Sequence, residues 1–271
     1  MFQERWIVDF MVYVYAISLA FSFADLLRPS KRLEQLSILF LSGVWVLQTI
    51  VLVVQRLALI PISASIDALS IYSWVLISFT LVMHFVYRMS ILFFIANSLS
   101  FIMLAIHLFF VRSSSPVMEK LLLSELVFLH VTLAMMANAF FSLASIGAGL
   151  YLVNNYLLKQ KKWNDLLRRL PSLDRLQGMS AWLLVLGTSL LLTAMTLGAI
   201  YAYQTIGAQF WEDAKVWSSL WVLALYAFIL WKWARRQWHG RKLAWWTLLS
   251  LFAVLSNYII TRAGFSFHHW I

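Results

Sequence analysis

The chain has 271 residues, of which 62% are hydrophobic and only 12% charged, and its formal net charge is +10. About a quarter of the residues in a soluble globular protein are charged, so this chain has too little polar surface to cover itself in water. We therefore predict a multi-pass membrane protein. The absence of cysteine excludes disulfides, thiolate metal sites and a cysteine nucleophile.

Eight segments are apolar over the roughly 20 residues that a helix needs to cross the hydrocarbon core of a bilayer. In chain order they are 6–27, 36–55, 66–87, 90–111, 126–157, 179–203, 215–234 and 243–262. All four prolines (Pro29, Pro61, Pro116 and Pro171) fall between segments, as expected for a residue that breaks helices. The prediction is an all-α helical bundle with eight transmembrane helices, forming a single transmembrane domain over residues 1–271.

Basic residues are unevenly divided between the two sets of connections. Fifteen Lys and Arg lie in or beside one set and six in or beside the other. Because cytoplasmic loops carry the excess of Lys and Arg, both termini are predicted to lie outside the cytoplasm, in a bacterial plasma membrane. The basic residues are spread over short loops, so they indicate topology and an attraction to anionic lipid and give no indication of nucleic-acid binding.

Three parts of the chain that carry histidine or tryptophan fall on the predicted outer face. His130 lies at the outer end of the fifth segment, the loop Trp211–Trp217 joins the sixth to the seventh, and His268 and His269 lie in the terminal tail. Two imidazoles beside an aromatic surface suggest a haem site. The alternative is ordinary: an interfacial histidine, a belt of interfacial tryptophans and a tail that packs on the membrane surface.

The residues around these positions refine the hypothesis. Ala134, Ala137 and Phe141 share the helical face of His130, and their side chains are small enough for a planar group or another helix to approach. Asp213 is placed to cap the seventh helix, because a carboxylate there accepts backbone N–H bonds and suits the positive end of the dipole. Trp217 and Trp221 are one helical turn apart.

Other polar residues inside the segments are weaker candidates. An ionisable residue within a membrane is costly, so His84 and His107 are candidates for a secondary site, with a bond to a neighbouring helix as the alternative. Amides such as Gln48 and Asn257 are expected to join helices. The sequence has no nucleophile–base order and no phosphate-binding glycine loop, so no enzymatic activity is expected.

Four stretches carry a resemblance to a known family. They are 65–74 (Ser-Ile-Asp-Ala-Leu-Ser-Ile-Tyr-Ser-Trp), Leu129–Val131 with the Ala-rich segment that follows, Leu170–Leu176, and the run from Gly198 to Lys242 with the tail histidines after it. Across roughly residues 60–271 the chain resembles the haem-handling membrane proteins of cytochrome c assembly, and most closely their shorter, HemX-type members.

The resemblance implies the chemistry of the site. In that family a tryptophan-rich loop forms a platform for haem, and external histidines are the axial ligands. Carried over, the ligands of a non-covalent haem b are His130 and His268, with His269 as the alternative to His268. The implied platform consists of Trp211, Asp213, Lys215, Trp217 and Trp221. Ligation by two imidazoles disfavours oxygen chemistry.

The chain also departs from the family pattern. The family loop usually reads Trp-x-Trp-Asp-Pro-Lys, whereas this chain has Trp-Glu-Asp-Ala-Lys over 211–215. No histidine occurs between Trp211 and Trp238 to form the second, intramembrane histidine pair of full-length synthases, and the large external domain is absent. These differences argue against a complete cytochrome c synthase.

Three functions follow from the resemblance and these departures. The first is control of haem biosynthesis by a haem-binding protein that restrains the level of glutamyl-tRNA reductase, directly or through an associated protease or regulator. The second is a haem chaperone or exporter for cytochrome c maturation. The third is a membrane scaffold that has kept the fold and lost the haem.

Overall fold

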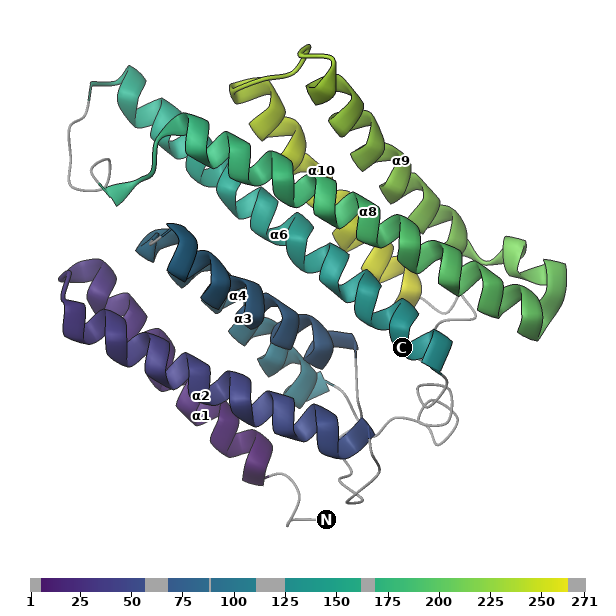
Figure 1. Cartoon of the computed structure of the whole chain (residues 1–271), viewed down its shortest axis with the longest axis horizontal. Helices are drawn as coiled ribbons and strands as arrows, with labels where there is room; N and C mark the ends of the chain where they lie inside the picture. The colour runs from purple at the N-terminus through teal and green to yellow at the C-terminus, as the bar shows by residue number, and fades with distance from the viewer. Residues whose placement is uncertain (1–5, 57–67, 88, 111–124, 162–168, 263–271) are drawn as a thin grey trace. The chain divides into compact units, whose positions relative to one another are not determined.

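The structure is a computed structural model that describes residues 6–56, 68–87, 89–110, 125–161 and 169–262 (Figure 1). Within these ranges the chain forms eight α-helices and one 3-10 helix, with no strand. In chain order they are α1 (Trp6–Leu27), α2 (Lys31–Arg56), α3 (Ala68–Tyr87), α4 (Ser90–Phe110), α6 (Glu125–Lys159), α8 (Leu173–Ile206), η1 (Gly207–Glu212), α9 (Ala214–Ala234) and α10 (Arg241–Arg262). The prediction of an all-α fold is confirmed.

Each predicted segment corresponds to one α-helix. By length and composition, seven of the described helices can cross a membrane. The side chains of α4 are described only over Ser90–Ile106, so its crossing stays a prediction, as does the position of both termini outside the cytoplasm. Many large apolar side chains are exposed along the helices, which is the surface expected of a protein that is covered by lipid.

Two helices begin earlier than hydropathy predicts because polar residues start them. α8 begins at Leu173, six residues before the predicted segment, and the Ser172 side chain caps it by accepting a hydrogen bond from the Arg175 N–H. α2 begins at Lys31, after a turn in which Asp25 Oδ1 accepts the Ser30 N–H at 2.9 Å. Pro29 and Pro171 lie in these two breaks, whereas Pro61 and Pro116 fall outside the described residues.

The residues group into two compact units, Met1–Leu123 and Ser124–Ile271, here called unit 1 and unit 2. In unit 1 the helices α1, α2, α3 and α4 form a closed ring in which each packs on two others. In unit 2 the ring consists of α6, α8, α9 and α10, with η1 against α8 and α9. The single transmembrane domain stays a prediction.

Unit 1 is joined by reciprocal polar contacts between neighbouring helices. Ser18 and Ser37 each donate a hydrogen bond to the other's carbonyl oxygen, at 2.8 and 3.2 Å, which ties α1 to α2. Ser73 and Ser100 do the same between α3 and α4. Gln48 Nε2 donates to Ser73 Oγ at 3.3 Å, so the predicted role of this amide in joining helices is confirmed.

Unit 2 is held by close packing of α6 against α8. A Cβ added to Gly187 on α8 would lie only 2.7 Å from Cε1 of Phe141 on α6. The Phe141 ring in turn stacks on Tyr226 of α9, with centroids 3.7 Å apart and planes 4° from parallel. Both rings are fully buried. Because lipid is as apolar as leucine, membrane helices associate through such close contacts at small residues.

A substitution at Gly187 tests this packing. We expect Gly187→Ala to lower stability by about 1–3 kcal/mol, because the added methyl group overpacks the core against the Phe141 ring. Gly178→Ala on the same helix is the matched control, since a Cβ there meets nothing within 4 Å; that change should be neutral or stabilising. Thermal unfolding of the two variants in detergent measures the difference, and equal melting temperatures would contradict the interpretation.

Candidate functional site

His130 lies at the start of α6 with its imidazole against α8. Its Nδ1 is 2.6 Å from the carbonyl oxygen of Ala194. A carbonyl oxygen can only accept a hydrogen bond, so Nδ1 carries the proton. In the neutral imidazole Nε2 then carries the lone pair, and this is the tautomer that binds a metal through Nε2.

Gly198, one turn beyond Ala194, provides the space for the His130 ring. A Cβ on Gly198 would lie 2.6 Å from both Cε1 and Nδ1 of His130 and 3.2 Å from Nε2. The small face of α6 that contains His130, Ala137 and Phe141 is thus approached by another helix, α8. Sequence analysis did not single out this role for Gly198, although a glycine in an apolar helix is a general signal of close approach.

The tryptophan-rich loop is the 3-10 helix η1 followed by the start of α9. Phe210 is buried, whereas Trp211 and Trp217 are 50% and 59% exposed. The Trp217 Nε1–H donates to the carbonyl oxygen of Trp211 at 2.7 Å, and their ring centroids are 6.2 Å apart. Trp221, one turn further along α9, is 69% exposed. The loop therefore presents three indoles, two of them held to each other.

Asp213 is the N-cap of α9, as the sequence predicts. Its Oδ1 accepts the backbone N–H of Lys215 at 2.8 Å, and the residue is only 2% exposed. Its carboxylate is therefore part of the scaffold under the indoles. Lys215 extends towards α10, where its Nζ is 3.5 Å from the carbonyl oxygen of Asn257.

Asn257 joins α10 to the start of α9. Its Oδ1 accepts a hydrogen bond from Ser218 Oγ at 2.7 Å, which confirms the predicted role of this amide between helices. One end of unit 2 thus brings together the start of α6 with His130, the end of α8, η1, the start of α9 and the end of α10. We call it the tryptophan end.

None of the other four predicted site histidines is described at the tryptophan end. His268 and His269 lie outside the described residues, as does the side chain of His107, although His107 is part of α4. His84 is 6% exposed near the end of α3 in unit 1, with Nε2 3.1 Å from Oε1 of Glu34. Its ring also meets Phe93 edge-on, with centroids 4.8 Å apart.

Sequence analysis missed Glu34 because the residue precedes the predicted second segment. The helix α2 extends back to Lys31 and so brings this carboxylate to the end of α3. The pair gives His84 a bond to a neighbouring helix, the alternative that the sequence left open. Within the described parts of the chain, no group of three or more His, Cys, Asp or Glu could hold a metal ion.

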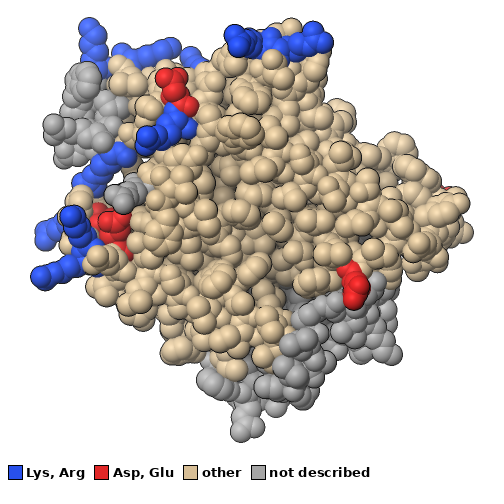
Figure 2. All heavy atoms as spheres, viewed as in Figure 1, with Lys and Arg blue, Asp and Glu red and all other residues tan. Residues whose placement is uncertain are grey.

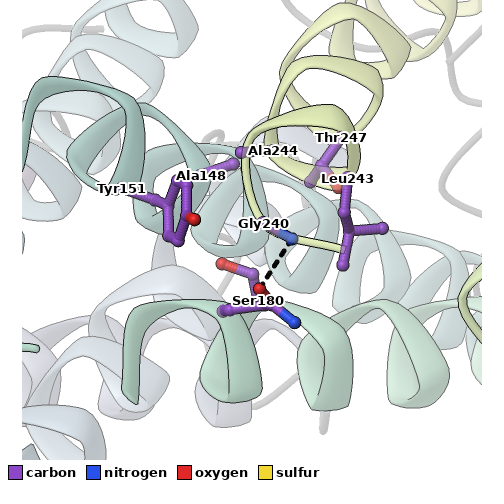
Figure 3. A pocket seen from close by; sticks show the side chains of 8 residues that line it. Ala148, Tyr151, Ser180, Gly240, Leu243, Ala244 and Thr247 are labelled. Carbon is purple, nitrogen blue, oxygen red and sulfur yellow. Dashed lines mark hydrogen bonds between the residues drawn. The ribbon is translucent and has the colours of Figure 1, made fainter. Parts of the chain in front are cut away.

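A pocket lies at the opposite end of unit 2 (Figure 3). It is lined by Tyr151 of α6, Ser180 of α8, Gly240 just before α10 and Thr247 in the second turn of α10. Its volume of about 10 Å³ is close to the minimum for one water molecule. A planar cofactor does not fit in that volume.

Comparison with known proteins agrees with the resemblance seen in the sequence. A family model described as "Cytochrome C assembly protein" matches residues 62–268. Protein HemX of Brevibacillus brevis is 34% identical over 275 residues, covering all of both chains. Protein HemX of Bacillus subtilis (strain 168) is 33% identical over 260 residues, covering 95% of this chain and 94% of its own.

The cap of α9 supports a direct prediction. Asp213→Ala should cost about 0.5–2 kcal/mol, because the N–H of Lys215 loses its acceptor. Asp213→Asn keeps a side-chain oxygen at the cap and should stay within a few tenths of a kcal/mol of the parent, since Asn and Asp are comparable N-caps. Thermal unfolding in detergent distinguishes these outcomes; equal losses in both variants would mean that the carboxylate charge, and not the cap, matters.

Proposed function

The chain belongs to the cytochrome c assembly protein family, and from this membership we propose that it is a membrane protein that binds haem at the tryptophan end of unit 2. The observation that carries the proposal is the hydrogen bond from His130 Nδ1 to the Ala194 carbonyl oxygen. It selects the tautomer that can ligate iron through Nε2, and a backbone acceptor behind a ligand histidine also orients the ring.

The remaining parts of the site are consistent with a planar, partly charged ligand. Trp211, Trp217 and Trp221 present exposed rings, which suit a porphyrin face. The Lys215 ammonium lies between the start of α9 and α10 and is the cation available to a propionate. His268, with His269 as its alternative, would be the second ligand, because both follow α10 in the sequence and α10 ends at this end of unit 2.

The chemistry that haem b supplies under this ligation is limited. Held by two imidazoles, haem b would supply an iron centre suited to electron transfer and unsuited to oxygen activation. The residues of the chain hold and orient the group. His130 is kept in one tautomer and Gly198 leaves room for its ring, while Asp213 fixes the start of α9 on which Trp217 and Trp221 stand.

We assign the protein to the control of haem biosynthesis, where it restrains the level of glutamyl-tRNA reductase directly or through a protease or regulator. A physical route requires that haem bind two packings of unit 2 with different affinity. α8 is suited to transmit such a change, because it contacts His130 near one end and begins at Leu173 among basic residues at the other.

A scaffold that has lost haem is the second candidate. It is favoured by the packing of α8 against the His130 face and by the shortened loop, which lacks the second tryptophan and the proline of the family pattern. The scaffold and the haem-binding protein are distinguished by one measurement, which is whether the purified protein binds haem.

We predict that the detergent-purified protein gives a sharp Soret band with split low-spin bands on reduction, and that His130→Ala abolishes this spectrum.

Gly198→Ala should weaken haem binding, because its methyl group displaces the imidazole, whereas Gly178→Ala should not. Gly198→Ala should also lower the melting temperature of the parent protein. It should not do so in the His130→Ala background, because the imidazole ring that the methyl group displaces is then absent. A spectrum that haem leaves unchanged would support the scaffold.

Regulation is tested separately in cells. Reversing Lys159, Arg169 and Arg175 to glutamate should raise the reductase towards its level in a strain lacking the protein, because these side chains are exposed at the end of unit 2 opposite the tryptophan end. The haem spectrum should be unchanged. If reductase levels do not move, this docking route fails; loss of c-type cytochromes on deletion would instead support the chaperone.

A further inference from the structure

Four aromatic rings form a continuous cluster where α9 ends and α10 begins. Trp238 stacks on Trp246 with centroids 4.9 Å apart and planes 11° from parallel. Phe228 meets Trp238 edge-on at 5.5 Å and lies 6.0 Å from Trp231. Trp238 is buried within the cluster, whereas Trp231 and Trp246 are exposed on the helix surface. The cluster therefore has a wide apolar face at the end of two helices of membrane-spanning length.

Three cations lie over these rings. Lys232 Nζ is 4.6 Å from the ring centroid of Trp231 and 5.5 Å from that of Phe228. Arg235 Cζ lies 5.7 Å from Trp231, and Lys242 Nζ lies 5.3 Å from Trp238. We call these three side chains the ring-backed cations. A ring quadrupole attracts each cation and holds it at a defined place on the surface.

The charge of the ring-backed cations is not balanced by a carboxylate among the described residues. None of them makes an ion pair with a carboxylate in the parts of the chain that the structure describes. Around them the same end of unit 2 carries further exposed Lys and Arg, and Figure 2 shows such side chains gathered at helix ends, above uncharged helix faces. An anion bound here would meet several positive charges at once.

The turn that carries the cations is fixed to the rest of unit 2. The Gly240 N–H donates to Gln177 Oε1 of α8 at 2.8 Å (Figure 3). Gly240 has a φ of +58°, and a Cβ there would lie 2.9 Å from the Tyr151 hydroxyl. Glycine therefore permits both the left-handed backbone and the close approach to α6. Because the backbone of the turn is anchored in this way, it loses little conformational entropy when a ligand binds.

We propose that the α9–α10 turn is a binding site for the headgroup of an anionic phospholipid. The phosphate meets Lys232, Arg235 and Lys242, and the acyl chains lie along the exposed faces of Trp231 and Trp246. A soluble acidic partner would use the charges but not the indoles, which stand where apolar helix gives way to a polar turn. Tryptophan and snorkelling Lys or Arg side chains occupy that level of a membrane. The site is independent of haem.

The test compares two lipids and two charge variants. Delipidated protein in neutral detergent is titrated with phosphatidylglycerol or phosphatidylcholine, and bound lipid is counted by native mass spectrometry while the melting temperature is followed. Phosphatidylglycerol should bind preferentially and raise the melting temperature more than phosphatidylcholine. The variant Lys232→Gln/Arg235→Gln/Lys242→Gln should lose most of that difference.

The matched control removes the same charge from the same end of unit 2 without touching the rings. Lys159→Gln/Lys161→Gln/Arg175→Gln should keep the preference for phosphatidylglycerol. An equal loss of the phosphatidylglycerol preference in both triple variants would overturn the proposal, because it would show that the lipid responds only to the total positive charge at this end of unit 2. Lack of any preference in the parent protein would also overturn it. Tighter binding of an acidic peptide than of phosphatidylglycerol vesicles at physiological salt would replace the lipid with a protein partner.

Discussion

Unit 2 depends on the close approach of α6 and α8, which is possible because glycine stands where the two helices meet. Gly147 of α6 faces Ser180, Gly187 of α8 faces Phe141, and Gly198 of α8 faces His130. In a bilayer the hydrophobic effect does not draw apolar helices together, so van der Waals contact and interhelical hydrogen bonds must do so. The His130 contact is one of this series, and the position of the candidate ligand is therefore a result of how the helices pack.

At the tryptophan end, hydrogen bonds join η1, the start of α9 and the end of α10. Asp213 starts α9 immediately after η1, and Trp217 returns a hydrogen bond to Trp211, so the loop is folded back on the helix that follows it. Lys215 and Ser218 then contact Asn257 of α10. Because each contact uses a backbone atom or the part-buried amide of Asn257, the three indoles are held in place by contacts that do not require a bound ligand.

The helices could be predicted from the sequence because the length of each apolar run shows directly whether a helix can span the bilayer. The α1 bounds coincide with the predicted segment, and the cap at Asp213 followed from a carboxylate at the start of an apolar run. The early starts of α2 and α8 were missed, since their first turns are polar and only the turn at Asp25 and the cap at Ser172 reveal them. The partners of His84 and His130 could not be predicted, because Glu34 and Gly198 are selected by the register between helices, which hydropathy does not contain.

The contact between Gly198 and His130 also has a consequence for how such proteins change over time. A side chain at position 198 would occupy the volume of the imidazole, so a lineage that replaces Gly198 first must lose or move the histidine. A lineage that loses the histidine first is released from the need for glycine. The two positions should therefore vary together among relatives, and a pair consisting of histidine and a larger residue should be rare.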